Sequence, residues 1–262
     1  MNEFLKFDDD HAREAETQYQ SPEVIQQRRE IRSLLNLKPG ESLLDIGCGP
    51  GILTYEMSEE VGPSGKINGL DISATMLDLA TNRCATRDWV SLTPGRAEEL
   101  PFPECSFDAV VAVQVYEYVE DIETALKEAF RVLKQGGRIV ILDTDWDSLV
   151  WNVHDRARLR TILDLWDEHL ADPRLPEKLP YLLSQANFAP VALEKVLTFI
   201  NQECHEKTYS YWLIGFIRSF LEQRSLMDES QLKAWIEELY GLASENRYFF
   251  SLNRYIFHAQ KP

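Results

Sequence analysis

A glycine-rich stretch near the start of the chain can place backbone N–H groups around a ligand. Its sequence is Leu43-Leu44-Asp45-Ile46-Gly47-Cys48-Gly49-Pro50-Gly51, an apolar strand-like run followed by three glycines. Glycine permits a tight turn and a close approach of backbone to ligand because no Cβ obstructs either. A helix expected over residues 52–61 would add unpaired N–H groups and the positive end of its dipole. The stretch therefore predicts a site for an anionic part of a ligand.

A carboxylate at the end of the next expected strand, residues 66–71, extends this site. Asp71 can accept hydrogen bonds from both hydroxyls of a ribose, in a nicotinamide dinucleotide or in another nucleoside cofactor. The dinucleotide fingerprint G-x-G-x-x-G needs its third glycine where Ile52 stands, and Gly51 comes one residue early. The glycine spacing therefore disfavours a dinucleotide, while Asp71 does not distinguish the cofactors.

Strands and helices alternate over the first part of the chain. Strands are expected over residues 42–46, 66–71, 89–93, 106–113, 138–143, 191–201 and 248–260. Amphipathic helices are expected between them, with helix caps at Ser21, Ser73 and Asp121. This order predicts an α/β fold with a parallel sheet and helices on both faces. Ligands of such sheets bind at the carboxyl ends of the strands, where the glycine stretch and Asp71 fall.

Composition excludes several classes of function. The chain has 262 residues, of which 44% are hydrophobic and 27% charged, as in ordinary soluble domains. A net charge of −16 argues against nucleic acid as a partner. No membrane span or signal-peptide core is seen, and the histidines and cysteines have no metal-ligand spacing. Four cysteines without a C-x-x-C pair indicate reduced thiols and a cytoplasmic protein.

Four motifs resemble those of one enzyme family. D-I-G-C-G-P-G at residues 45–51 resembles the first motif of the class I S-adenosylmethionine-dependent methyltransferases with a Rossmann-like fold, in particular their type 11-like small-molecule subgroup. Residues 95–103 resemble that group's G-D-A-x-x-L-P-F, with Arg96 in place of the acid that contacts adenine. S-F-D-x-V at residues 106–110 and L-K-Q-G-G-R at residues 133–138 resemble two further motifs. The resemblance covers residues 42–145.

The resemblance implies S-adenosyl-L-methionine as methyl donor, S-adenosyl-L-homocysteine as product and a doubly wound, mostly parallel seven-stranded sheet whose last strand is antiparallel. It also implies a division of the single domain 1–262 into an N-terminal helical lid (1–41), a cofactor-binding core (42–145) and a remainder (146–262) with a helical cap inserted near 205–245. The predicted cofactor contacts are Asp45, Gly47, Cys48, Gly49, Gly51, Asp71, Ile72, Met76, Arg96, Ala97, Glu98, Val113 and Gln114.

The acceptor side is predicted from aromatic and acidic residues near the carboxyl edge of the sheet. Candidate substrate contacts are Tyr19, Trp146, Tyr209 and Trp212. A hydroxyl acceptor would need a general base, for which the candidates are Tyr116, Glu117, Asp145 and Asp147. The cofactor carries the chemistry, so the protein mainly orients the reactants and excludes water.

These observations predict a methyltransferase that acts on a small molecule, as a monomer or homodimer. Two alternatives stay open. One is an NAD(P)-linked oxidoreductase, disfavoured by the glycine spacing and by the lack of a Tyr-x-x-x-Lys pair near the site. The other is a nucleotide-binding protein without catalysis, an alternative that the unusual Arg96 keeps open.

Overall fold

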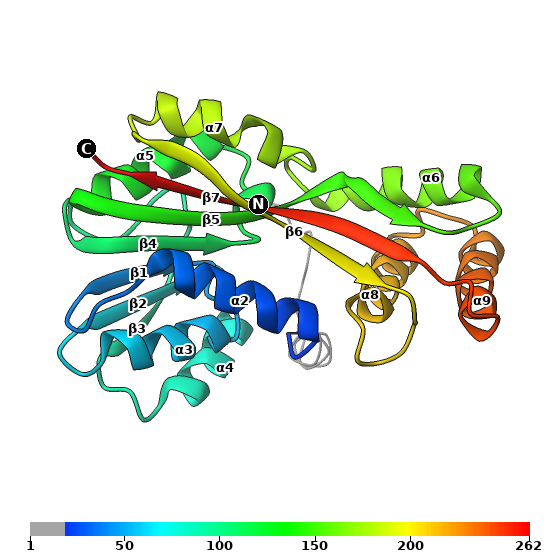
Figure 1. Cartoon of the computed structure of the whole chain (residues 1–262), viewed down its shortest axis with the longest axis horizontal. Coiled ribbons are helices and arrows are strands. Elements are labelled where there is room, and N and C mark those ends of the chain that lie inside the picture. The colour runs from blue at the N-terminus through cyan, green and yellow to red at the C-terminus, as the bar shows by residue number, and fades with distance from the viewer. Residues whose placement is uncertain (1–18) are drawn as a thin grey trace.

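A seven-stranded sheet forms the frame of the molecule, in a computed structural model that describes residues 19–262 (Figure 1). The strand order is β3-β2-β1-β4-β5-β7-β6, and only β7 runs antiparallel to its neighbours. This confirms the predicted fold class. The strands are β1 (Ser42–Ile46), β2 (Lys66–Asp71), β3 (Val90–Pro94), β4 (Phe107–Val113), β5 (Leu133–Trp151), β6 (Val191–Asn201) and β7 (Phe250–Gln260).

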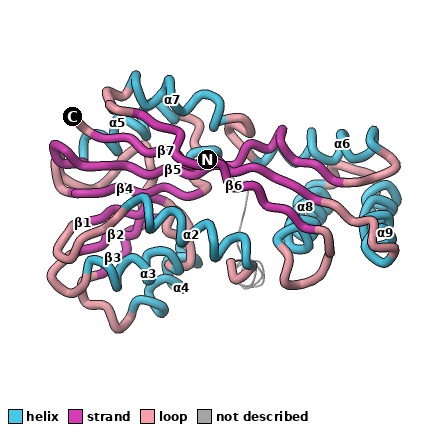
Figure 2. The backbone as a smooth tube through the Cα atoms, in the orientation of Figure 1, coloured by secondary structure: helices cyan, strands magenta, loops and turns pink. Residues whose placement is uncertain are grey.

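Helices connect the strands and cover the sheet (Figure 2). Two of the predicted caps are confirmed: Ser73 Oγ accepts from the Met76 N–H at 3.3 Å, and Asp121 Oδ1 accepts from the Thr124 N–H at 3.0 Å. Ser21 precedes its helix but makes no side-chain capping bond. The helices are α2 (Pro22–Leu35), α3 (Ile52–Val61), α4 (Ala74–Cys84), α5 (Ile122–Val132), α6 (Arg156–Trp166), α7 (Leu175–Gln185), α8 (Tyr209–Arg224) and α9 (Glu229–Ser244), with short 3₁₀ turns η1 (Tyr116–Tyr118) and η2 (Asp167–His169).

Strand β4 shows why the sheet needs helices on both faces. Ala109 and Val111 point into the core shared with α2 and α3, whereas Val110 and Ala112 point into the core shared with α5 and α7. Because successive side chains of a strand point to opposite faces, an unbroken apolar strand must be covered on both sides. The chain leaves β1 toward β2 and leaves β4 toward β5, so a crevice opens between the loops after β1 and β4, where such sheets bind ligands.

The three strands β5, β6 and β7 extend beyond the others and carry the remaining helices (Figure 1). Strand β5 pairs with β4 as far as Leu142, then continues along β7 to Trp151. Helices α6, α8 and α9 pack against one another on this extension, where the rings of Trp151 and Trp235 lie 5.5 Å apart. The prediction that the fifth strand spans only residues 138–143 is wrong. Strand β5 has a second partner, the antiparallel β7, which keeps the chain extended as far as Trp151. We call α6, α8 and α9 the helical cap.

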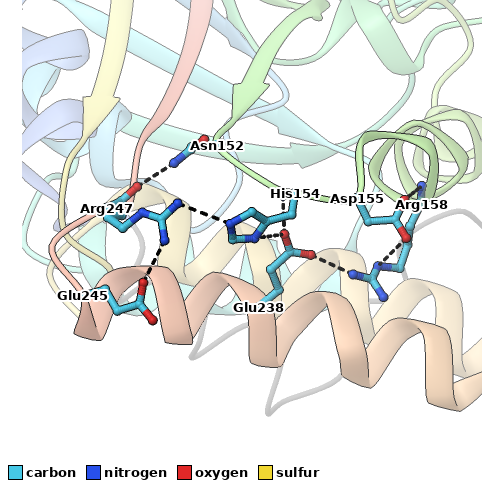
Figure 3. A network of polar contacts seen from close by, with 7 residues as sticks. All are labelled: Asn152, His154, Asp155, Arg158, Glu238, Glu245 and Arg247. Carbon is cyan, nitrogen blue, oxygen red and sulfur yellow. Dashed lines mark hydrogen bonds and ion pairs between the residues drawn. The ribbon is translucent and has the colours of Figure 1, made fainter.

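A polar network joins two parts of the cap (Figure 3). The Glu238 carboxylate of α9 accepts hydrogen bonds from the His154 backbone N–H and from Arg158 Nη2, the latter at 2.7 Å. Its side chain is only 12% exposed. Charge-assisted bonds to a carboxylate with so little water around it contribute more than surface ion pairs do.

We expect Glu238→Ala to lower the free energy of unfolding by about 2 kcal/mol, because the Arg158 guanidinium and the His154 N–H lose their acceptor. Glu237→Ala is the matched control, since its side chain is 67% exposed and its ion pair with Lys233, at 3.7 Å, lies on the surface. That change should cost less than about 0.5 kcal/mol. Urea denaturation followed by circular dichroism measures both, and equal losses would contradict a stabilising role for the network.

Candidate active site

A cavity of about 430 Å³ lies at the carboxyl ends of β1, β2 and β4. Its walls also come from α2, the start of α4, the turn at residues 95–98 and the cap. Every predicted cofactor residue except Gly51 lines this cavity. A cavity enclosed by apolar walls with a few convergent polar groups is the usual form of a small-molecule site.

The glycine loop forms the floor of the cavity. The Gly47 N–H donates to the Leu70 carbonyl at 2.7 Å, which ties the loop to β2. Gly47 has φ +68°, a conformation that L-residues with a Cβ rarely adopt. Gly51 plays a different part: a Cβ there would come within 2.9 Å of the Ala80 Cα, so this glycine lets α3 pack closely on α4. Gly51 therefore lies behind the loop that forms the cavity floor and does not line the cavity.

Asp71 is held in place by the loop that it faces. Its Oδ2 accepts from the Gly49 N–H at 2.8 Å, and its Oδ1 accepts from the Ser73 N–H at 2.8 Å. Burial raises the pKa of Asp71, although these N–H groups oppose the shift. The carboxylate therefore points along the cavity wall in a fixed orientation, with lone pairs left for a ligand's hydroxyl groups.

Asp45 is the most deeply buried acid of the cavity wall. Its Oδ2 accepts from Thr54 Oγ1 at 2.5 Å, and its Oδ1 has no hydrogen-bond partner among the described residues. Burial raises the pKa of Asp45 to about 7, opposed by the Thr54 bond and assisted by the charge of Asp71. A buried acceptor without a partner favours a ligand group that donates a hydrogen bond or carries positive charge.

This raised pKa predicts how stability depends on pH. The folded protein keeps a proton on Asp45 between about pH 4 and pH 7, whereas the unfolded chain releases it. The free energy of unfolding of the ligand-free protein should therefore fall as the pH rises through this interval. Urea denaturation at pH 5 and pH 7.5 should show a smaller fall in Asp45→Asn than in the parent, and equal falls would contradict the prediction.

The turn at residues 95–98 forms the rim where the resemblance placed adenine. Arg96 Nη2 donates to Glu98 Oε1 at 2.6 Å, and the Arg96 side chain is 49% exposed. Ala97 is buried, while Ile72 on the facing side is 64% exposed. The ion pair with Glu98 therefore holds the Arg96 side chain at the rim, and this side chain does not fill the cavity.

Aromatic rings surround the other half of the cavity. Of the predicted substrate contacts, Tyr19, Trp146 and Tyr209 line it. Trp212 does not: its Nε1 donates to the Glu206 carbonyl at 2.7 Å, and its ring packs on Tyr211 outside the cavity. Three further aromatic rings, which were not among the predicted substrate contacts, line this half: Tyr118, Trp166 and Phe216.

The predicted general bases lie elsewhere. Gln114 adopts φ +55° and the chain then enters η1, so Tyr116 turns into the core beneath α5 and α7. Burial also raises its pKa far above the ordinary value. Asp145 and Asp147 lie on the continuation of β5, where Asp147 faces Arg174 at 3.6 Å. None of the three lines the cavity.

Glu117, the remaining acidic candidate, lies behind the cavity wall. Its Oε2 accepts from the Thr144 N–H at 3.1 Å and from Trp146 Nε1 at 3.3 Å. Burial raises its pKa to about 7, opposed first by the Thr144 bond and then by the charge of Arg254. The carboxyl thus positions the Trp146 ring and does not itself reach the cavity.

The polar cavity residues that the prediction missed include Gln27, Arg28, Glu120 and Arg254. For Arg254 the sequence did hold a signal. It falls in phase with the buried residues Phe250, Leu252 and Ile256 of β7, so an arginine occupies a core position of an alternating strand.

Comparisons with known proteins identify the core. Residues 44–141 match a family model described as a methyltransferase domain. Over these residues, which are less than half of the chain, the sequence is that of a methyltransferase domain. The demethylmenaquinone methyltransferase of Listeria monocytogenes is 33% identical over 150 residues, 56% of this chain and 63% of that enzyme. The chain thus spans less than two thirds of the length of this curated relative.

Solved structures share the fold of the methyltransferase domain and of the cap-bearing remainder. YcgJ from Bacillus subtilis is 20% identical with a TM-score of 0.65, over 90% of this chain and 98% of that one. Phosphoethanolamine N-methyltransferase 2 of Haemonchus contortus, solved with phosphomonomethylethanolamine and S-adenosylhomocysteine, is 19% identical with a TM-score of 0.65 over 100% of this chain and 60% of that one.

Two further observations concern residues 19–262. No helix in this part is long and apolar enough to cross a membrane. No group of three His, Cys, Asp or Glu side chains there is arranged to hold a metal ion.

Proposed function

We propose that this methyltransferase domain moves a methyl group from S-adenosylmethionine to a small-molecule acceptor that binds between the glycine loop and the cap. The observation that carries the proposal is the Asp71 carboxylate, oriented by the Gly49 N–H in the wall of the cavity. That arrangement suits a ribose beside a glycine-rich turn, and the motif order supports the cofactor of the methyltransferase family.

The cavity residues fit this cofactor in three places. Asp71 would accept from the ribose hydroxyls, the Ala97 N–H and the exposed face of Ile72 would contact adenine, and Asp45 would face the ammonium of the methionine part. The Oδ1 of Asp45, which lacks a partner among the described residues, supports the last assignment. When bound, the cofactor supplies an activated methyl group on a sulfonium.

The acceptor would react without a carboxylate base from the predicted set. Tyr116, Asp145 and Asp147 do not line the cavity. Of the acids that do, Asp45 and Asp71 are assigned to the cofactor, Glu98 is paired with Arg96, and Glu120 is exposed. The protein would therefore contribute orientation and exclusion of water by its aromatic walls. An acceptor atom that is already nucleophilic when it binds suits such a site. We infer that the acceptor arrives as an anion, a thiolate or a neutral amine.

Calorimetric titration with S-adenosylmethionine, S-adenosylhomocysteine and NAD(H) tests the cofactor. Binding of the first two and not the third supports the proposal, followed by methyl-transfer assays with a small-molecule panel that includes demethylmenaquinone. Binding of NAD(H) alone would favour an oxidoreductase, and cofactor binding without turnover across the panel would favour a catalytically silent binding protein.

Other expectations stay predictions. Four free cysteines, two of them buried, support a cytoplasmic protein with reduced thiols. We retain the division into a lid (1–41), a core (42–145) and a remainder with its insertion near 205–245 as a proposal; residues 1–18 of the lid lie outside the described residues, and α8 and α9 fall within the insertion. A monomer or homodimer is also retained.

A further inference from the structure

Arg254 is a buried cation in the aromatic half of the cavity. It is 1% exposed, stands on β7 and lines the cavity wall. Its Nη1 donates to Gln27 Oε1 at 2.5 Å, and its Nη2 donates to the Tyr209 hydroxyl at 2.7 Å. The guanidinium carbon also lies 4.5 Å from the centre of the Phe199 ring. Neutral groups from three elements therefore fix the position of this charge.

No carboxylate of residues 19–262 lies within 4.0 Å of the Arg254 guanidinium. The other two arginines of the cavity wall differ in this respect, because Arg28 pairs with Glu56 at 3.0 Å and Arg96 pairs with Glu98 at 2.6 Å. A guanidinium carries five N–H groups, of which two have partners here, and the Nε of Arg254 is buried without one. Burial of an unpaired charge is costly, so a site that keeps one requires an explanation.

Glu117 does not supply that explanation. Arg254 influences the titration of this acid and of the buried Asp143. Glu117 accepts hydrogen bonds from the Thr144 N–H and Trp146 Nε1, and Asp143 accepts one from the Val115 N–H, so neither acid is paired with Arg254. Burial also raises the pKa of both acids, which reduces their negative charge near neutral pH. The positive charge of Arg254 is therefore incompletely balanced by the described residues that surround the cavity.

We propose that Arg254 binds a carboxylate on the acceptor, whose apolar or aromatic body packs against the rings of Trp146, Trp166 and Tyr209 that line the cavity. This inference rests on the proposed function, and it names the acceptor class as small aromatic or apolar carboxylic acids. The planar guanidinium fork matches a carboxylate, and a single cation balances its single charge. A phosphate would bring up to two negative charges to one arginine.

Tyr209 adds a second donor to this subsite. Because its hydroxyl oxygen accepts from Arg254, the hydroxyl proton is left to donate to a ligand. The rings of Trp146 and Trp166, with centroids 5.8 Å apart and nearly perpendicular, supply apolar surface beside it. The subsite thus combines one charge, one hydroxyl and aromatic walls.

Paired probes test the proposal on the full chain saturated with S-adenosylhomocysteine. Benzoate, 2-naphthoate and indole-3-acetate are titrated calorimetrically, each against its neutral amide. We expect at least one carboxylate to bind about 10- to 100-fold more tightly than its amide, and Arg254→Met to remove that preference. Arg218→Met, at an exposed residue of α8 away from the cavity, should leave the preference intact. Absence of any preference in the parent, or its survival in Arg254→Met, overturns the proposal.

A second variant covers the case in which Arg254→Met does not fold. Tyr209→Phe keeps the ring but removes the hydroxyl, and it should weaken carboxylate binding several-fold while leaving amide binding unchanged. Equal effects on both probes would count against the subsite. The same titrations separate this inference from the proposed function: if the parent fails to bind S-adenosylhomocysteine, the function fails, whereas cofactor binding without carboxylate preference refutes only the subsite.

Discussion

Replacing Asp71 by alanine is expected to weaken S-adenosylhomocysteine binding about 100-fold or more. The carboxylate would lose its bonds to two ribose hydroxyls, and bonds to charged acceptors contribute about 1.5–3 kcal/mol each. The Gly49 and Ser73 N–H groups would also lose their acceptor, so the loop that faces the cofactor would be less ordered. Isothermal titration calorimetry measures the change directly.

The control for this variant lies seven residues away on α4. Asp78 is exposed and does not line the cavity, so Asp78→Ala should leave the dissociation constant within about twofold of the parent. Asp71→Asn is informative as well, because it keeps one acceptor oxygen and should lose less affinity than the alanine variant. Unchanged binding in a folded Asp71→Ala protein would refute the ribose assignment.

The second large effect is expected from Gly47→Ala. The new Cβ would lie 2.2 Å from Val115 Cγ2, and the residue would keep φ +68°. Val115 is β-branched and cannot simply rotate away, so the loop or β4 must shift. We expect a loss of about 3 kcal/mol in the free energy of unfolding, the sum of the left-handed backbone penalty and the overlap.

Two companion variants separate these contributions. Gly136 has φ +75° and open space around its Cβ position, so Gly136→Ala should cost only the backbone penalty of about 1 kcal/mol. Adding Val115→Ala to Gly47→Ala removes the overlap and should recover part of the loss, as a double-mutant cycle in urea denaturation would show. If Gly47→Ala and Gly136→Ala cost the same, the close approach to Val115 has no energetic weight.

The cofactor half of the site was predictable because its determinants are local. The residues from Gly47 to Gly51 form a turn whose conformation depends on their own glycines, and Asp71 is the last residue of a strand that pairs directly with β1. The unbroken apolar run of β4 likewise indicates its central position without knowledge of its neighbours. Patterns of this kind involve residues close together in the sequence, so they predict where the side chains lie.

The acceptor half depends on contacts between distant parts of the chain. Arg254 and Gln27 are 227 residues apart, and neither position has a motif that points to the other. Tyr116 was misplaced for a different reason: the left-handed Gln114 redirects the chain after β4, and a non-glycine residue gives little warning of that conformation. The length of β5 depended on its second partner, β7, which also could not be seen locally.

The cap's connection to the core has a consequence for substrate range. The paired strands β5, β6 and β7 run from the core to the cap and support it, whereas hinges that open binding sites usually lie in loops. Little entropy is then lost when an acceptor of the right shape enters, but little adaptation is available to one of the wrong shape. We expect the site to select acceptors by their shape. Homologous acids that differ by one ring or one chain carbon should therefore differ strongly in their rates of methylation.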